Sequence, residues 1–217
     1  MSGKAKFKWF LIAPIVIALF VCINSPAISW AGELEDAKKN VFKHPKSASA
    51  HIRLGISYAK SGQDQDALAS FKEGIRLKPD DERGQFFLGL AYEKLSQYQN
   101  AIASFKESIR LRPGSAKTHF WLGTSYGKSG QHQDAITSFK EAIRIKPDYS
   151  YAYLNLGRAY LKSGQYQNAI DSSKEAIRLR PDDANAHINL GAAYATLNQY
   201  QNSIAPFKEA IRLRPDD

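Results

Sequence analysis

The sequence predicts an all-α chain of antiparallel helix pairs that stack side by side. Five prolines stand 34 residues apart, five glycines keep the same spacing, and the apolar residues of each copy recur every three or four positions. A fixed period of this length is typical of repeat arrays, and the apolar spacing is typical of helices. The markers are Pro79, Pro113, Pro147, Pro181 and Pro215, with Gly55, Gly89, Gly123, Gly157 and Gly191.

The array has five predicted repeats, and we number the positions of each from 1 to 34 with the proline at position 32. The repeats are 48–81, 82–115, 116–149, 150–183 and 184–217. Positions 4, 7, 8 and 11 share one face of a first helix, and positions 20, 24 and 28 share one face of a second. A break at positions 14 to 16 separates the two helices, and it contains glycine in the first, third and fourth repeats. At position 34, Asp81, Ser115 and Asp183 are predicted to cap the next first helix.

Two positions predict how the helices of a repeat pack. Glycine at position 8 of the first helix lowers helix stability by about 1 kcal/mol relative to alanine, so we expect a neighbouring helix to pass very close to it. The aromatic residue at position 24 is expected to fill the space between the helices, and Ser173 replaces it in the fourth repeat. Pro206 lies inside the last second helix, which we expect to be kinked, frayed or covered by a partner.

The N-terminal region differs from the repeats. Three lysines precede an uncharged run at residues 9–23, and small residues stand before Gly32. This order is typical of a secretory signal at residues 1–31, cleaved after Ala31. Residues 32–47 then form a half-repeat, whose helix covers the first repeat with Leu34, Ala37 and Val41.

Other readings of the N-terminal region remain open. Ala27 is a second cleavage position, and residues 9–31 are long enough to serve as an uncleaved inner-membrane anchor. Lipidation at Cys22 is disfavoured because Val21, rather than a small residue, precedes it. The cleaved signal and the anchor both predict that the repeats lie outside the cytoplasm, either periplasmic or secreted.

The charge of the chain favours acidic partners only weakly. The formal net charge is +9, from 30 basic and 21 acidic residues, and removal of the three signal lysines leaves 27 basic residues and a charge of +6. Lysine at position 25 and arginine at position 29 recur in all five repeats, with glutamate at position 26 between them. We interpret this stripe on the second helices as a solvated face, with binding to an anionic membrane surface or polyanion as the alternative. Nucleic acid is disfavoured by the extracytoplasmic location.

The pattern resembles the tetratricopeptide repeat family. The resemblance covers residues 48–217 and depends on Leu-Gly at positions 7 and 8, Tyr at 11, Ala at 20, an aromatic residue at 24, Ala at 27 and Pro at 32. The repeat at 150–183 reads SYAYLNLGRAYLKSGQYQNAIDSSKEAIRLRPDD. The resemblance implies a tetratricopeptide-repeat solenoid, wound as a right-handed superhelix. It also implies that the first helices line a concave groove, which binds a peptide or helix of another protein.

Twelve residues of the first helices are predicted partner contacts. They form an aromatic zone, a polar zone and a basic edge: Phe86, Phe87, Leu90, Phe120 and Trp121; Tyr151, Asn155, Arg158 and Asn189; Lys94, Lys128 and Lys162. For Phe86 and Phe120 packing is the stronger interpretation, whereas Phe87 and Trp121 are expected to be exposed anchors. The two asparagines suit a peptide backbone because an amide both donates and accepts hydrogen bonds. The carboxylate clamp of some family members is absent, since position 5 is always apolar.

We predict a non-catalytic interaction scaffold. No nucleophile elbow, phosphate loop or HExxH motif is found, and three of the five histidines share position 4, where packing is a better account than metal binding. We therefore predict no catalytic, cofactor or metal site. A non-catalytic subunit of an envelope enzyme or assembly complex is an alternative, and self-association through the C-terminal repeat is a further one.

Overall fold

The computed structural model describes residues 26–215, across which the chain forms eleven helices and no strand. Helix α2 (Pro26–Lys43) precedes five helix pairs, as predicted. The first helices have 13 residues each and the second helices 14. The pairs are α3 (Ala48–Lys60) with α4 (Asp64–Leu77), α5 (Glu82–Lys94) with α6 (Tyr98–Leu111), α7 (Ala116–Lys128) with α8 (His132–Ile145), α9 (Ser150–Lys162) with α10 (Tyr166–Leu179), and α11 (Ala184–Thr196) with α12 (Tyr200–Leu213).

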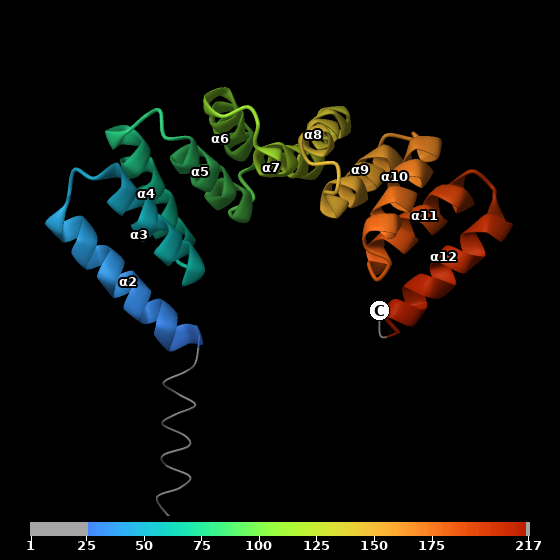
Figure 1. The fold of residues 1–217 in the computed structure, drawn as a ribbon, viewed down its shortest axis with the longest axis horizontal. Helices are drawn as coiled ribbons and strands as arrows, with labels where there is room; N and C mark the ends of the chain where they lie inside the picture. The colour runs from blue at the N-terminus through green and yellow to red at the C-terminus, as the bar shows by residue number, and fades with distance from the viewer. Residues whose placement is uncertain (1–25, 216–217) are drawn as a thin grey trace, which may run out of the picture. The chain divides into compact units, whose positions relative to one another are not determined.

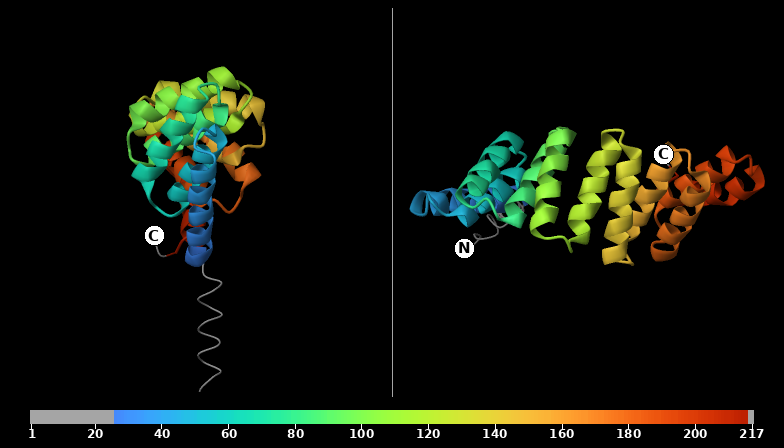
Figure 2. Two further views of the ribbon diagram at one scale, coloured as in Figure 1. Left: turned by 90° about the vertical axis from the view of Figure 1, so that its left-hand side faces the viewer. Right: turned by 90° about the horizontal axis from the view of Figure 1, so that it is seen from above.

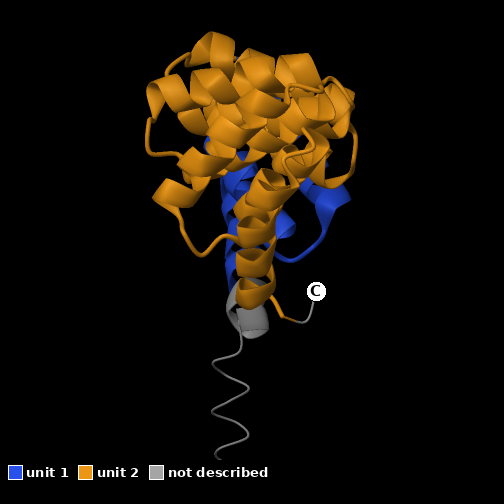
Figure 3. Cartoon of the chain, turned by 90° about the vertical axis from the view of Figure 1, so that its right-hand side faces the viewer, with its two compact units in different colours: residues 1–79 blue, residues 80–217 orange. Residues whose placement is uncertain are grey.

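The chain divides into two compact units (Figure 3). Unit 1 ends at Pro79 and contains α2, α3 and α4, and unit 2 begins at Asp80 and contains α5 to α12. Within unit 2 the helices follow one another side by side in chain order (Figure 2, right). Each first helix of unit 2 packs against the second helix of its own repeat. Helices α7, α9 and α11 also pack against the second helix of the preceding repeat. The predicted stacking of helix pairs is therefore confirmed within unit 2.

The first helices lie on the inner side of unit 2. Consecutive first helices contact each other, α5 with α7, α7 with α9 and α9 with α11, whereas no two second helices of the described part of unit 2 do. Figure 1 shows α5, α7 and α9 on the inner side of the curve of this unit, with α6 and α8 outside them. Side chains on the free face of the first helices therefore share one surface of unit 2.

Side-chain caps begin the first helices where the sequence predicts them. Asp81, Ser115 and Asp183 each accept a hydrogen bond from a backbone N–H in the first turn of the helix that follows, and so does Ser47. Tyr149, at the same position before α9, makes no such bond. A cap of this kind stabilises a helix by about 1 kcal/mol. The caps therefore account for the constant starting point of four of the five first helices.

The close approach predicted at position 8 is confirmed. A Cβ built on Gly89 would lie 2.6 Å from the Phe105 ring, and a Cβ on Gly123 would lie 2.8 Å from the Phe139 ring. Alanine at this position would displace the aromatic ring of position 24. The glycine is therefore required because the ring packs directly on the backbone of the first helix.

The fourth repeat lacks this ring. Ser173 is fully buried, and its Oγ lies 2.9 Å from a Cβ built on Gly157. Its hydroxyl has no hydrogen-bond partner in the described part of the chain. A buried hydroxyl without a partner costs about 1–3 kcal/mol. The serine in place of the aromatic residue therefore lowers the stability expected of this repeat.

Helix α2 covers α3, as the half-repeat predicts. It packs against α3, and Leu34 is buried. The helix begins at Pro26, earlier than residue 32, and so includes the predicted cleavage positions at Ala27 and Ala31. Most of the predicted signal at residues 1–31 lies outside the described residues, and its cleavage stays a prediction. No helix within residues 26–215 has both the length and the apolar character that crossing a membrane requires.

The last helix is continuous despite Pro206. Helix α12 spans the same 14 positions as the other second helices, and Pro206 is buried within it. The fraying expected from Pro206 is therefore wrong. The outer face of α12 is exposed: Ile204 is 45% accessible, whereas its equivalent Ile170 in α10, which α11 covers, is 1% accessible.

Candidate functional site

The aromatic zone of the first helices contributes mainly to packing. Phe86 is only 9% accessible, and its ring centroid lies 5.9 Å from that of Phe105. Phe120 lies between Phe139 and Tyr149, at centroid distances of 5.9 and 5.1 Å. The packing interpretation of Phe86 and Phe120 is confirmed, and Phe86 is corrected from a partner contact to a core residue.

The other predicted anchors are half-buried. Phe87 packs edge-on against Phe86 at 5.5 Å, and Trp121 packs edge-on against Phe120 at 5.6 Å. Phe87, Trp121 and Leu90 all pack against the core of unit 2. The two rings are only partly exposed, because each has an aromatic neighbour on its own helix, and their role as partner contacts stays a prediction. The exposed aromatic residue of this group is Tyr151, at 49%.

Four of the predicted polar and basic contacts line one cavity. It has a volume of 260 Å³ and lies between α7, α8 and α9 in unit 2. Lys128 contributes from the end of α7, and Asn155, Arg158 and Lys162 contribute from successive turns of α9. The remaining lining residues are Gly123, Thr124, Gly127, His132, Phe139 and Ala159. Of the twelve predicted contacts, these four share the cavity.

The cavity forms because α7 carries small residues on its free face. Position 9 is Leu90 in the second repeat and Thr124 in the third, and position 12 is Glu93 in the second and Gly127 in the third. Sequence analysis missed Thr124 and Gly127, together with His132. A comparison of each position between repeats could have found them, since glycine occurs at position 12 in this repeat alone.

The lysines of the basic edge differ in their partners. Lys128 forms an ion pair with Glu93 of the preceding repeat and lies 5.8 Å from the centroid of the Tyr98 ring. Lys162 occupies the equivalent place one repeat later, and there Gly127 replaces the glutamate. Within residues 26–215, Lys162 forms no hydrogen bond or ion pair. Lys94 is exposed at the end of α5, away from the residues that line this cavity.

The two asparagines make different contacts. Asn155 donates from Nδ2 to the carbonyl of Tyr151 at 2.8 Å, and its Oδ1 accepts from Arg158 at 2.7 Å. Asn189 donates from Nδ2 to the carbonyl of Leu154 at 3.2 Å, which links α11 to α9. Asn189 is therefore corrected from a freely available peptide contact to a residue that joins two first helices.

The basic stripe on the second helices is paired with carboxylates. In every repeat the arginine at position 29 forms an ion pair with the glutamate three residues before it, at 2.6 to 2.9 Å. The hydrogen bonds from these arginines lower the pKa of the glutamates in four pairs, those of Glu73, Glu107, Glu141 and Glu209. In the second, third and fourth repeats the lysine at position 25 lies over a tyrosine ring of the next first helix, as Lys106 does over Tyr126 at 5.6 Å. These pairs favour the solvated-face interpretation.

The histidines at position 4 are linked to backbone carbonyls. The Nε2 atoms of His51, His119 and His187 lie 2.9 to 3.0 Å from the carbonyl oxygens of Pro45, Pro113 and Pro181. Each histidine therefore holds the loop that precedes its own helix. In the part of the chain that the structure describes, no group of three or more His, Cys, Asp or Glu residues could hold a metal ion.

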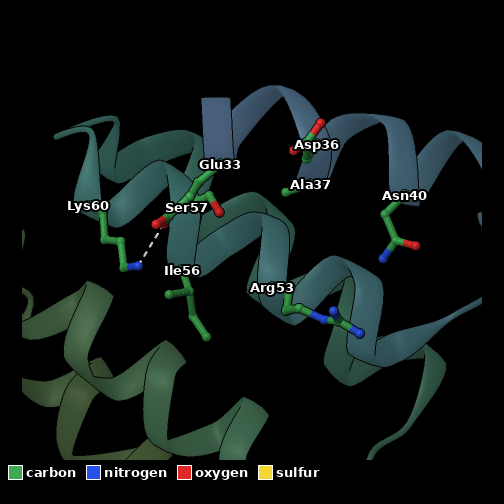
Figure 4. Close-up of a pocket in the computed structure, with 8 residues that line it drawn as sticks. All are labelled: Glu33, Asp36, Ala37, Asn40, Arg53, Ile56, Ser57 and Lys60. Carbon is green, nitrogen blue, oxygen red and sulfur yellow. Dashed lines mark hydrogen bonds and ion pairs between the residues drawn. The ribbon is translucent and has the colours of Figure 1, made fainter. Parts of the chain in front are cut away.

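Unit 1 contains a second cavity, of 350 Å³, between α2 and α3 (Figure 4). Glu33 and Asp36 line it from α2, and Arg53 and Lys60 line it from α3. Lys60 is already paired with Glu33 at 2.8 Å, and the Asp36 side chain points away from that pair. Because both signs of charge are represented, this cavity indicates no particular ligand charge. The cavity between α7, α8 and α9 in unit 2, which has no acidic lining residue, is the better candidate.

Solved structures of similar fold cover most of the chain. A crystal structure of MamA is 25% identical, with a TM-score of 0.72, over 75% of this chain and 95% of that one. MamA from Desulfovibrio magneticus RS-1 is 24% identical, with a TM-score of 0.74, over 78% and 97%. YrrB, described as a TPR protein with an unusual peptide-binding site, is 20% identical, with a TM-score of 0.74, over 84% and 94%. No curated protein sequence matches the chain.

Family models match nearly all of the repeat region. Models described as tetratricopeptide repeat match residues 34–82, 52–116 and 184–217, and a model described as TPR repeat matches residues 125–164 and 157–197. The matches agree with the helix pairs of both units and with the family signature at positions 7, 8, 11, 20, 24, 27 and 32. The chain belongs to the tetratricopeptide repeat family.

Proposed function

We propose that this protein-interaction scaffold binds a polypeptide segment of a partner protein on the first-helix face of unit 2. The observation that carries the proposal is the cavity between α7, α8 and α9, where Asn155, Arg158 and Lys162 lie together. An extended segment offers backbone amides and side chains to such a surface, and polar side chains with few competing contacts suit it. The peptide-binding site described for YrrB lends support at the level of the fold.

Site-specific photocrosslinking in cells tests the proposal. A photoreactive amino acid at Thr124, inside the cavity, is expected to give a discrete crosslinked product with a partner protein. The matched control is Thr137, which is exposed on α8 outside this cavity. Arg158→Glu is expected to lower the yield at Thr124, because it reverses a charge beside the bound segment. Equal products from both positions, or none at Thr124, would reject the binding face.

The proposed location is outside the cytoplasm, and it rests on the order of charges and apolar residues in the first 31 residues. The mass of the N-terminus of the protein isolated from cells distinguishes cleavage after Ala31 from retention as an anchor. Binding to an anionic membrane or polyanion is a weaker alternative, because the arginines of the outer stripe are paired with glutamates. We propose no catalytic role.

We also propose that a second copy of the chain covers the outer face of α12. Tyr200, Ile204 and Ile211 are exposed there, although α7, α9 and α11 cover the equivalent faces of α6, α8 and α10. Two identical apolar faces can pair about a two-fold axis, which is the commonest arrangement of homodimers.

Sedimentation equilibrium tests this association. The wild-type protein is expected to show a mass that rises with concentration toward a dimer. Ile204→Glu is expected to keep it monomeric, since the variant places two charges in the apolar contact. The control is Ala69→Glu, at an exposed position of α4 in unit 1. A wild-type protein that stays monomeric up to high concentration would exclude the dimer.

A further inference from the structure

We infer that the cavity between α7, α8 and α9 binds a carboxylate side chain of the partner segment, an inference that rests on the proposed function. The carboxylate would pair with Lys162 in the place where Glu93 pairs with Lys128 one repeat earlier. The ligand class is therefore an acidic peptide, with an aspartate or glutamate at one defined position.

The second and third repeats supply the template. Glu93, near the end of α5, pairs with Lys128, at the end of α7, and its side chain is only 10% exposed. One repeat later Lys162 stands at the end of α9, but Gly127 stands where the glutamate would be. Lys162 therefore stands where a lysine pairs with an acid in the preceding repeat, but no acidic residue among residues 26–215 pairs with it. The Lys162 side chain is exposed at this place, so a ligand that brings a carboxylate can pair with its ammonium group.

The missing side chain leaves room for the ligand. A Cβ built on Gly127 would have a single neighbour, the Ala135 Cβ at 3.9 Å, which is an ordinary contact distance. The space in front of it belongs to the cavity of 260 Å³. Phe139 and Ala159 contribute apolar lining, against which the aliphatic part of a glutamate would pack. The cavity is therefore large enough for a carboxylate group, and its apolar lining suits the aliphatic part of a glutamate side chain.

The charges around the cavity are of one sign. Lys128, Arg158 and Lys162 line it, and no aspartate or glutamate does. Lys128 is paired with Glu93, whereas Arg158 bonds through one nitrogen to the amide oxygen of Asn155. A guanidinium has five N–H donors, so Arg158 retains donors for the same carboxylate that Lys162 binds.

A double-mutant cycle with selected peptides tests the inference. A displayed library of short random peptides is selected on the full-length protein, held in mild detergent because residues 9–23 are uncharged and apolar. We expect the selected peptides to share one acidic position. Replacing that residue by its amide should weaken binding to the wild-type protein by about tenfold or more. The same replacement should weaken binding to Lys162→Met by less than it weakens binding to the wild-type protein. Once Arg158→Met is added, it should change binding by less than about threefold, because these two side chains supply the charges that pair with the carboxylate.

Gly127→Glu gives an independent test, because it supplies the missing acid from α7. It should weaken the selected peptide by about tenfold or more, whereas Gly127→Ala should leave binding nearly unchanged. Circular dichroism should show both variants folded, since glutamate and alanine favour helices more than glycine does.

The possible failures separate the two proposals. Peptides without an acidic position, or with one that is insensitive to Lys162→Met and Gly127→Glu, would overturn the inference and leave peptide binding intact. A library that yields no binder would overturn peptide binding itself, and the carboxylate site with it.

Discussion

Replacing Phe105 by alanine is expected to lower the free energy of unfolding by about 3–5 kcal/mol. Its ring is fully buried and packs on Gly89 in the same repeat, 2.6 Å from where a Cβ would be, and against Phe86 at 5.9 Å between centroids. Truncation would leave a cavity between α5 and α6, because glycine has no side chain that could fill it. Neighbouring repeats in such an array stabilise one another, so the loss should extend beyond the pair.

Urea unfolding followed by circular dichroism measures this effect. The matched control is Ser173→Ala, which changes the same position in the fourth repeat. The serine hydroxyl is buried without a partner in the described part of the chain, so alanine there is expected to be neutral or stabilising. A loss below about 1 kcal/mol for Phe105→Ala would show that α5 and α6 can close the gap.

Replacing Pro206 by alanine is expected to stabilise the protein by up to about 3 kcal/mol, which is the usual cost of a proline inside a helix. Helix α12 is continuous through Pro206, so the alanine N–H would find the Asn202 carbonyl already in place four residues earlier. The proline ring also crowds that carbonyl, and alanine removes the contact. Both effects increase helicity and raise the melting temperature.

Far-UV circular dichroism and thermal unfolding measure the change. Ser172→Ala is the control, because Ser172 is a buried residue at the same position in α10. Its effect is expected to be within about 1 kcal/mol, the range of helix propensities for ordinary residues. An unchanged melting temperature for Pro206→Ala would mean that the proline packs as favourably as the missing hydrogen bond is costly.

The charged side chains of the second helices and those of the first helices differ in whether they are paired, and this difference explains how one repeat pattern supports both stability and binding. Arginine and glutamate on the second helices occur in every repeat and form an ion pair in each. The first-helix face varies from repeat to repeat, and its variable positions leave Lys162 without an acid. The repeated pairs therefore belong to the solvated outer face, while the differences between repeats create the candidate site.

The sequence alone determined the helices and their pairing. Each boundary depends on local chemistry. Asp81 or Ser115 caps the start of a first helix, and a residue with positive φ, such as Gly62, ends the first helix before the second begins. A proline follows the second helix. The packing of Phe105 on Gly89 also follows from the pattern, because only glycine leaves room for the ring. Such features recur every 34 residues and can be recognised without coordinates.

Only the tertiary structure decided which side chains are available. Phe86 and Tyr151 are both predicted partner contacts on first helices, yet Phe86 is buried against Phe105 and Tyr151 is exposed. Asn189 donates a hydrogen bond to a carbonyl 35 residues away. Lys162 has no ion-pair partner among the described residues, because a glycine stands in the preceding repeat where the acid would be. The exposure of a side chain and its ion pairs depend on residues that are distant in the chain. The periodicity of side chains along one helix carries no information about those residues.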